Sequence, residues 1–159
     1  AVQGATGYQI YRKKGSKVTM IGQTSGTVFL DQNPVSGRSS YYAKAIKGSL
    51  TGKEGSAKKI TLPKATTKVT AKAKTDKTVV LSWKKVKGAT GYLVYRSTKK
   101  NGSYQRIAVL KKGTKCTYTD KKGLKKGMKY YYRIVTVKKK TYSPAKTTKA
   151  VKIKAAKKK

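Results

Sequence analysis

The sequence contains no histidine, and its 159 residues include only four acidic side chains. General acid–base catalysis, histidine-assisted nucleophiles and most metal centres need histidine or clustered carboxylates. The four acids stand far apart in the sequence, at Asp31, Glu54, Asp76 and Asp120. The sequence therefore predicts a non-catalytic protein with no catalytic, metal-binding or cofactor-binding residues and no cofactor.

Cysteine and long apolar stretches are also scarce. The single cysteine, Cys116, cannot close a disulfide within the chain, so packing alone must hold the fold. It alternates with Tyr118 along an expected strand, and we expect it to be a small buried hydrophobic residue. No apolar run approaches the roughly 18 residues that a membrane-spanning helix requires. We therefore expect no membrane insertion.

The charge is almost entirely of one sign. Lysine and arginine number 41 against the four acids, the formal net charge is +37, and 36 of the basic residues are lysines. Lysines at outward positions keep strands soluble and stop sheet edges from pairing. A surface that only needed solubility would mix both signs, and so large a charge repels itself in a compact fold. The excess therefore favours an anionic partner.

What the sequence does contain is a pattern of short strands. Threonine, valine and 12 tyrosines are plentiful, and apolar residues alternate, as at Val79, Leu81 and Trp83. The pattern predicts seven strands in the last 90 residues or so, which is typical of an immunoglobulin-like sandwich. The fold class is therefore all-β. The expected core of this sandwich includes Trp83, Tyr92, Val94, Tyr130 and Ile134.

An internal duplication accounts for the length. The segment Gly-Ala-Thr-Gly-Tyr-x-x-Tyr-Arg occurs at residues 4–12 and again at 88–96. Further on, residues 29–31 match 118–120, and Tyr41 matches Tyr130 at the same separation. The sequence therefore predicts two copies of one domain.

The second copy resembles a known family. Its segments 81–83, 91–94 and 124–134 are similar to the B, C and F strands of fibronectin type III domains, and its lysine-rich style resembles such domains on Gram-positive bacterial surface proteins. The resemblance implies tandem immunoglobulin-like β-sandwiches. It also implies that Tyr130 ties the F strand to the preceding turn, with Tyr41 as its counterpart. Asp31 and Asp120, shortly before these turns, are expected to bond to backbone amides.

The duplication predicts an incomplete first domain. Residues 1–63 form a domain without the A and B strands, residues 64–155 form a complete domain, and residues 156–159 form a basic tail. Without those strands, the inner face of the first domain would be open. Either the chain is a fragment of a longer protein, or another chain supplies the strands through self-association.

Strand alternation also sorts the tyrosines and predicts a candidate site. If Tyr92, Tyr130 and Tyr132 point inward, then Tyr95 and Tyr131 point outward on neighbouring strands. We expect them to form an exposed pair bordered by Arg96 and Arg133, with Tyr11 and Tyr42 as counterparts in the first copy. Two interpretations are open for this face: a surface on which a ligand stacks, or cross-strand packing that only stabilises the sheet.

Taken with these observations, the family resemblance implies an extracellular spacer and adhesion module of a bacterial surface or secreted protein. Its partner would be an anionic cell-wall polymer or an acidic glycan, held by the lysine-rich surface. Nucleic acid is the alternative partner, bound only nonspecifically, because arginine is scarce and no groove-reading motif is present. A further alternative is a structural subunit that self-assembles by strand exchange.

Overall fold

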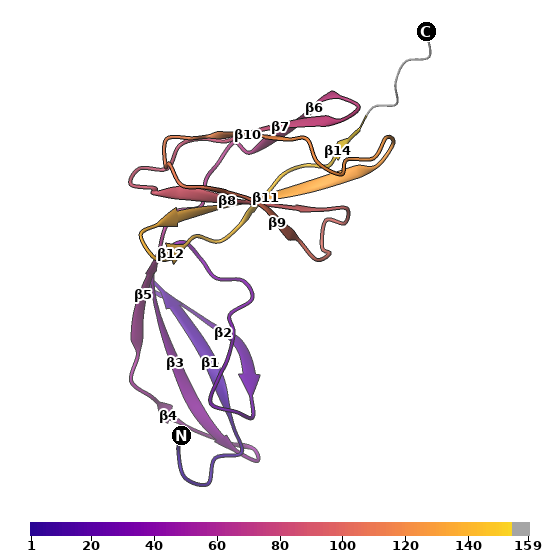
Figure 1. Ribbon diagram of the computed structural model, residues 1–159. Helices are drawn as coiled ribbons and strands as arrows, with labels where there is room; N and C mark the ends of the chain where they lie inside the picture. The colour runs from indigo at the N-terminus through magenta and orange to yellow at the C-terminus, as the bar shows by residue number, and fades with distance from the viewer. Residues whose placement is uncertain (154–159) are drawn as a thin grey trace. The chain divides into compact units, whose positions relative to one another are not determined.

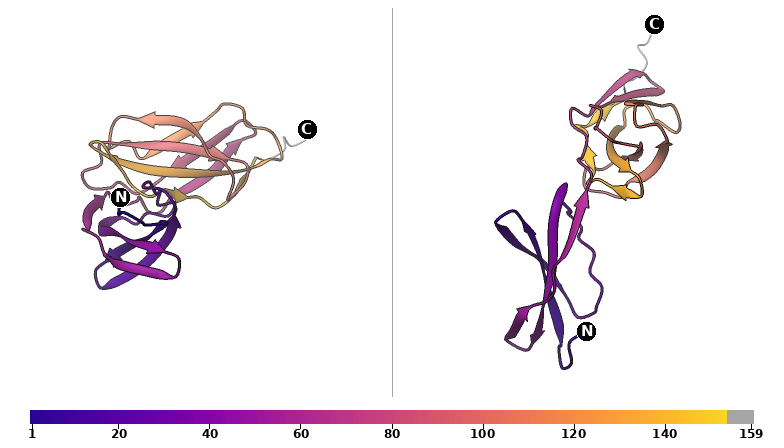
Figure 2. Two further views of the ribbon diagram at one scale, coloured as in Figure 1. Left: turned by 90° about the horizontal axis from the view of Figure 1, so that it is seen from below. Right: turned by 90° about the vertical axis from the view of Figure 1, so that its left-hand side faces the viewer.

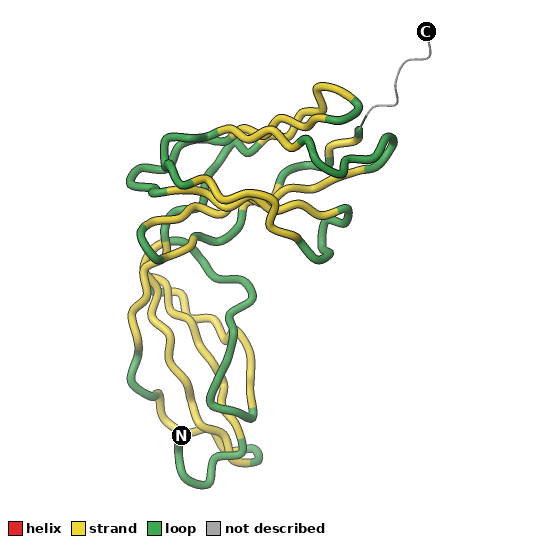
Figure 3. Tube along the Cα trace, in the orientation of Figure 1, coloured by secondary structure: helices red, strands yellow, loops and turns green. Residues whose placement is uncertain are grey.

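The computed structural model describes residues 1–153, and within that range it consists of strands joined by loops (Figures 1 and 3). The chain divides into two compact units, Ala1–Leu62 (unit 1) and Pro63–Lys159 (unit 2). The expected basic tail, residues 156–159, lies outside the described residues. No helix in the described part is long and apolar enough to cross a membrane.

Unit 2 is a sandwich of two antiparallel sheets (Figure 2). The first sheet has the order β10-β7-β6 and is formed by β6 (Thr70–Thr75), β7 (Thr78–Ser82) and β10 (Thr117–Asp120). The second has the order β11-β8-β9 and is formed by β8 (Gly91–Ser97), β9 (Gln105–Leu110) and β11 (Lys129–Lys138). Three short strands also pair with β11, namely β12 (Thr141–Tyr142), β13 (Lys146–Thr147) and β14 (Val151–Lys152).

The core of unit 2 lies between these sheets and confirms the sequence prediction. Trp83, Tyr92, Val94, Tyr130 and Ile134 are all buried. The rings of Trp83 and Tyr92 meet edge to face, with centroids 5.3 Å apart and an interplanar angle of 64°, a favoured aromatic geometry. Cys116 is only half-buried at the margin of this core, less than expected from sequence.

Three short strands, β12, β13 and β14, follow β11, where the sequence pattern predicts a single last strand around Val151 and Ile153. Two hydroxyl groups replace ladder bonds along β11: Ser143 Oγ accepts from the Thr136 amide at 2.9 Å, and Thr148 Oγ1 accepts from the Tyr132 amide at 3.0 Å. Pro144, which follows Ser143, has no amide hydrogen to donate. The segment after β11 is therefore held against β11 by side-chain hydroxyl groups as well as by backbone hydrogen bonds.

Unit 1 is a single sheet (Figures 1 and 2). Its strands are β1 (Gly7–Lys14), β2 (Lys17–Thr24), β3 (Gly37–Lys47), β4 (Leu50–Glu54) and β5 (Lys58–Leu62). The order is β2-β1-β3-β4, and β5 pairs with the start of β3. This sheet corresponds to β9-β8-β11 of unit 2. Residues 1–62 contain no counterpart of β6 and β7, as the sequence predicts for a domain without its A and B strands, and the counterpart of β10 is a loop.

One face of the unit 1 sheet is consequently open. Tyr8, Ile10 and Ala43 are only half-buried there, and with Phe29 they line a groove of about 250 Å³. The loop that carries Phe29 also exposes Val28 and Leu30. The face that is covered by a second sheet in unit 2 is thus apolar and accessible in unit 1.

The repeated Gly-Ala-Thr-Gly-Tyr segment has a structural explanation. Gly88 has φ +76°, which favours glycine. The Thr90 amide and hydroxyl both donate to the Val137 carbonyl, and the Tyr92 hydroxyl accepts from the Val86 amide at 3.1 Å. Gly91 lies so close to the Leu110 carbonyl oxygen on β9 that a Cβ atom would clash with it. The same contacts recur in unit 1, so this segment serves the fold.

We predict that Gly91→Ala destabilises unit 2, because an added methyl group forces β9 away from β8. Overpacking of this kind costs about 1–3 kcal/mol. Chemical denaturation followed by the fluorescence of Trp83, the single tryptophan, measures the loss. Thr98→Ala, at an exposed position just beyond β8, is the control and should change little. An unchanged unfolding midpoint for Gly91→Ala would contradict the close approach of the two strands.

Candidate functional site: the outer face of the unit 2 sheet

The outer face of sheet β11-β8-β9 carries three of the six residues expected to form a site, Tyr95, Tyr131 and Arg133. Tyr92 and Val94 of β8 point into the core, so the alternate residues Leu93 and Tyr95 point outward. On β11, Tyr132 and Ile134 are buried, so Tyr131 and Arg133 share that outward face. The sequence-based alternation of β8 and β11 is confirmed here.

The strand register places a row of three side chains across this face. Tyr95 lies opposite Arg133 of β11 on one side and opposite Arg106 of β9 on the other. Directly opposed residues of antiparallel strands point to the same face. Tyr131 lies opposite Ser97, one position further along, so Tyr95 and Tyr131 are diagonal neighbours.

Arg133 is held in place by an aromatic ring. Its guanidinium carbon lies 3.8 Å from the ring centroid of Tyr104, which precedes β9, so the side chain reaches across β8. Burial raises the pKa of Tyr104 above its ordinary value of 10.0, and the nearby Arg133 charge opposes that rise. Stacking of this kind is favourable for a planar guanidinium. The stacking therefore fixes the orientation of the Arg133 guanidinium.

Neither carboxylate of unit 2 neutralises the positive charge of Arg106 and Arg133 in this row. Asp76, in the turn between β6 and β7, lies 3.2 Å from Lys126 Nζ. Asp120 ends β10 and is 1% exposed. Both acids belong to the other sheet, so the face with Arg106 and Arg133 is cationic.

Arg96 does not border this face, contrary to the sequence prediction. It points inward, where its Nη1 lies 2.9 Å from Asp120 Oδ2 and donates to the Lys122 carbonyl at 2.6 Å. The Tyr132 hydroxyl donates to the same Asp120 oxygen at 2.9 Å. The physical reason is alternation, because Arg96 directly follows the outward Tyr95. We call Arg96, Asp120 and Tyr132 the latch of unit 2.

Unit 1 repeats this latch. Arg12 Nη1 lies 2.7 Å from Asp31 Oδ2, and the Tyr41 hydroxyl donates to that oxygen at 3.0 Å. Tyr41 is therefore the counterpart of Tyr132, which corrects its expected match with Tyr130. The expected backbone bonds of the two acids are confirmed, since Asp31 Oδ1 accepts from the Asn33 amide and Asp120 Oδ1 accepts from the Lys122 amide.

The tyrosine that fixes the turn before β11 is Tyr130, as the family resemblance implies. Its hydroxyl accepts from the Lys125 amide at 2.9 Å and donates to the Gly123 carbonyl at 3.5 Å. Since Tyr41 corresponds to Tyr132, the position equivalent to Tyr130 in unit 1 is two residues earlier, at Ser39. Its Oγ is buried without a hydrogen-bond partner. Unit 1 therefore lacks this tyrosine tie.

Tyr11 and Tyr42, the expected counterparts in unit 1, form a different arrangement. They lie directly opposite each other on β1 and β3, and their rings stack with centroids 5.2 Å apart and planes 7° apart. Tyr42 is only 7% exposed, and Lys44 Nζ lies 5.4 Å from the Tyr11 ring centroid and 4.0 Å from Glu54. These two rings cover each other. By register, Tyr42 corresponds to Arg133 and not to Tyr131.

Two residues of the site were missed in the sequence, Tyr104 and Arg106. A β-bulge shifts the register between Val94 and Tyr95, so that Ala108 lies opposite Val94 and Arg106 opposite Tyr95. Simple alternation would have placed Arg106 and Ala108 on one face. The available signal was the Asn101-Gly102 turn, which brings the start of β9 back beside β8.

The family model for the fibronectin type III domain matches residues 63–151. The chain belongs to the fibronectin type III family. Two curated relatives are amylopullulanases: that of Thermoanaerobacterium saccharolyticum is 40% identical over 78 residues, and that of Thermoanaerobacter thermohydrosulfuricus is 44% identical over 59 residues. These matches cover 49% and 37% of this chain but only 6% and 4% of the relatives.

Solved structures support the fold of the fibronectin type III chain. The FN1–FN3 domains of chicken CNTN1 match with a TM-score of 0.51 and 16% identity, over 94% of this chain and 56% of theirs. A two-domain fibronectin type III segment of chicken tenascin matches with a TM-score of 0.50 and 18% identity, over 96% and 87%. At such identities the likeness concerns the fold alone.

We predict that Tyr132→Phe destabilises unit 2 and that the loss depends on pH. Burial, and then the charge of Asp120, raise the pKa of Tyr132 well above 10.0. A raised pKa favours the neutral hydroxyl in the fold, so its contribution is complete below pH 10 and falls as the unfolded tyrosine ionises above it. The variant should lose about 2 kcal/mol at pH 7. The difference in unfolding free energy between wild type and Tyr132→Phe should shrink by about 1.4 kcal/mol per pH unit above pH 10.

Urea denaturation between pH 7 and pH 11 measures this gap. Tyr142→Phe is the control, because Tyr142 is 54% exposed and lies outside the latch. Comparing variants at each pH removes the effect of lysine titration, which is common to all of them. A gap between wild type and Tyr132→Phe that stays constant up to pH 11 would contradict the buried latch.

Proposed function

We propose that this chain is part of a non-catalytic extracellular spacer and adhesion module of a bacterial surface or secreted protein. Its lysine-rich surface would attract anionic wall polymers or acidic glycans. Two units in tandem, Ala1–Leu62 and Pro63–Lys159, support a spacing role. Among the described residues, no group of histidine, cysteine or acidic side chains could hold a metal ion.

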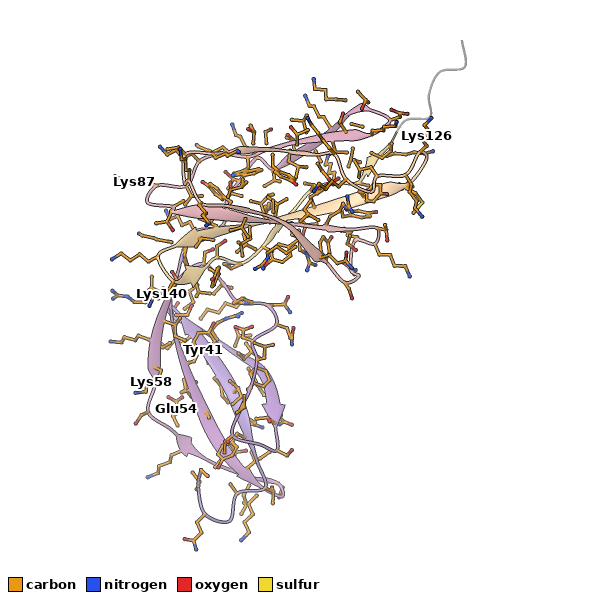
Figure 4. All side chains as sticks on the ribbon, in the orientation of Figure 1. Tyr41, Glu54, Lys58, Lys87, Lys126 and Lys140 are labelled. Carbon is orange, nitrogen blue, oxygen red and sulfur yellow. The ribbon has the colours of Figure 1, made fainter. Side chains whose placement is uncertain are left out.

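The observation that carries the proposal is the pairing of every acid in the chain. Asp31 pairs with Arg12, Glu54 with Lys44, Asp76 with Lys126, and Asp120 with Arg96. No other acidic side chain exists to balance the remaining lysines. Lys58, Lys87 and Lys140 are exposed and project from the ribbon in Figure 4. A polyanion would relieve the repulsion among such charges.

The relatives favour a place in a larger extracellular protein. The chain matches small segments of two amylopullulanases, and a segment of that size fits an accessory module beside other domains. We propose the same arrangement for this chain, at the cell surface or secreted. Loose attachment through many lysines would then hold the larger protein near the wall or matrix.

The test is binding to purified teichoic acid, a sulfated glycan and duplex DNA across a salt series. We expect binding to the first two to persist at about 0.15 M salt, where exposed charges are largely screened beyond about 8 Å. A variant with Lys58, Lys87 and Lys140 replaced by glutamine should lose affinity and show a shallower salt dependence. If all three polymers bind equally and all three lose their affinity near 0.15 M salt, the binding is only nonspecific attraction between charges. Tighter binding to DNA would favour the nucleic-acid alternative.

A second candidate function, self-assembly by strand exchange, is favoured by the open face of unit 1. Tyr8, Ile10 and Phe29 line an apolar groove there, whereas β7 of unit 2 covers the equivalent face with Val79 and Leu81. We propose that a second copy of the chain can cover this groove, because burying apolar surface stabilises by about 25 cal/mol per Å².

Light scattering tests this self-association. The chain as given should form concentration-dependent dimers or larger species if neighbours cover the groove. Adding a segment with the sequence of residues 67–85 before Ala1 should convert it into a monomer, because the added strands cover the face internally. A monomeric and cooperatively folded chain without the extension would refute strand exchange.

A further inference from the structure

We propose that the outer face of unit 2 formed by Tyr95, Tyr104, Tyr131, Arg106 and Arg133 binds acidic saccharides, whose rings lie on tyrosine while their carboxylate or sulfate groups bind arginine. We call these five residues the arginine–tyrosine face. The inference rests on the proposed function and deepens it, since it names a ligand class and a site for an attraction otherwise spread over many lysines.

The distribution of arginine singles out this face. The chain has 36 lysines and five arginines, at positions 12, 38, 96, 106 and 133. Arg12 and Arg96 are held by buried or half-buried carboxylates in the two latches. Of the other three, Arg106 and Arg133 occupy one cross-strand row. Lysine supplies the charge elsewhere, so arginine here indicates a need for its planar fork, which binds two oxygens at once and stacks on rings.

The spacing of the row suits a saccharide. Arg106 and Arg133 lie on the two strands that flank β8, so their backbones are about 10 Å apart, two strand spacings. Tyr95 lies between them, half-buried and facing outward. A sugar ring resting on Tyr95 would bring its acidic substituents near Arg106 and near the Arg133 guanidinium, which lies over Tyr104. Tyr131, diagonal to Tyr95, extends the aromatic surface along β11.

The site is preorganised and complementary in charge. Arg133 stacks on Tyr104 at 3.8 Å, which fixes the plane of its fork and limits the entropy lost on binding. Asp76 and Asp120, the two acids of unit 2, pair elsewhere, with Lys126 and Arg96. A ligand carboxylate would therefore meet no competing carboxylate side chain of this unit.

An acidic glycan fits these observations better than nucleic acid does. Arg133 covers one face of the Tyr104 ring, so this guanidinium is held in a fixed plane. A stacked guanidinium matches a planar carboxylate with two parallel hydrogen bonds, whereas the many lysines would suffice for phosphates. Nucleic acid remains an outcome of the test.

The experiment compares matched variants of the full chain by calorimetry at about 0.15 M salt. Arg106→Lys/Arg133→Lys keeps the net charge and removes both forks, and Tyr95→Ala removes the central ring. Arg38→Lys, in unit 1, is the control that changes an arginine away from the site. The probes are an oligogalacturonate, a neutral maltooligosaccharide, inorganic polyphosphate and an oligothymidylate.

We expect wild type and Arg38→Lys to bind oligogalacturonate alike. The double lysine variant and Tyr95→Ala should bind it about tenfold more weakly, as expected for the loss of a bidentate or stacking contact. Their binding to polyphosphate should change less than twofold. On wild type, the amide signals that oligogalacturonate shifts in nuclear magnetic resonance spectra should lie in β8, β9 and β11, a readout that does not depend on any variant folding.

Each other outcome overturns the inference. If the variants lose as much affinity for polyphosphate as for oligogalacturonate, the face contributes only nonspecific charge attraction. Tighter binding of maltooligosaccharide than of oligogalacturonate would exclude an acidic ligand. Tighter binding of oligothymidylate would assign the face to nucleic acid. Signal shifts scattered over lysines on both sheets would contradict a site. If wild type binds anionic polymers and the variants match it, the inference fails while the proposed function stands. If wild type binds no anionic polymer, the proposed function fails as well.

Discussion

The interaction on which the rest of the structure depends is the buried latch of arginine, aspartate and tyrosine. In unit 2 it joins β8 through Arg96, the end of β10 through Asp120, and β11 through Tyr132. An unpaired charge at the nearly inaccessible Asp120 would be costly, so the three groups fix one another. Because strands alternate, an inward Arg96 requires an outward Tyr95, and an inward Tyr132 requires an outward Arg133. The latch therefore also sets the arrangement of the outer face.

The same latch shapes the charge of the surface. Two of the four acids, Asp31 and Asp120, accept hydrogen bonds from arginine and tyrosine inside or at the margin of their units. Only Glu54 and Asp76 remain to pair with lysines, the half-buried Lys44 and the exposed Lys126. Surface pairs of this kind contribute little to stability. The fold thus does not depend on surface ion pairs, and this leaves the lysines available to an outside partner.

The sequence predicted the all-β class, the core around Trp83 and the outward side of β8 and β11, because period-two alternation and burial follow from the same pleated geometry. It placed Tyr41 wrongly because the loop between aspartate and the latch tyrosine has two more residues in the second copy, 120 to 132 against 31 to 41. A match based on Asp31 and Asp120 cannot detect that difference. Arg106 was missed for a similar reason, since a bulge in β9 changes the face of every residue before it.

The two units show how one position decides what an outward tyrosine can do. Tyr11 and Tyr95 are equivalent in the repeat, but the residue opposite Tyr11 is Tyr42 and the residue opposite Tyr95 is Arg133. In unit 1 the two rings therefore stack on each other and Tyr42 is buried. In unit 2 Arg133 extends instead to Tyr104, and Tyr95 has an arginine opposite it on each neighbouring strand. The cross-strand packing interpretation thus describes unit 1, whereas the geometry of unit 2 leaves a flat ring flanked by charge. The family fold supplies the same strand arrangement twice, and the residue opposite the outward tyrosine decides whether that tyrosine stacks on a second ring or lies beside an arginine.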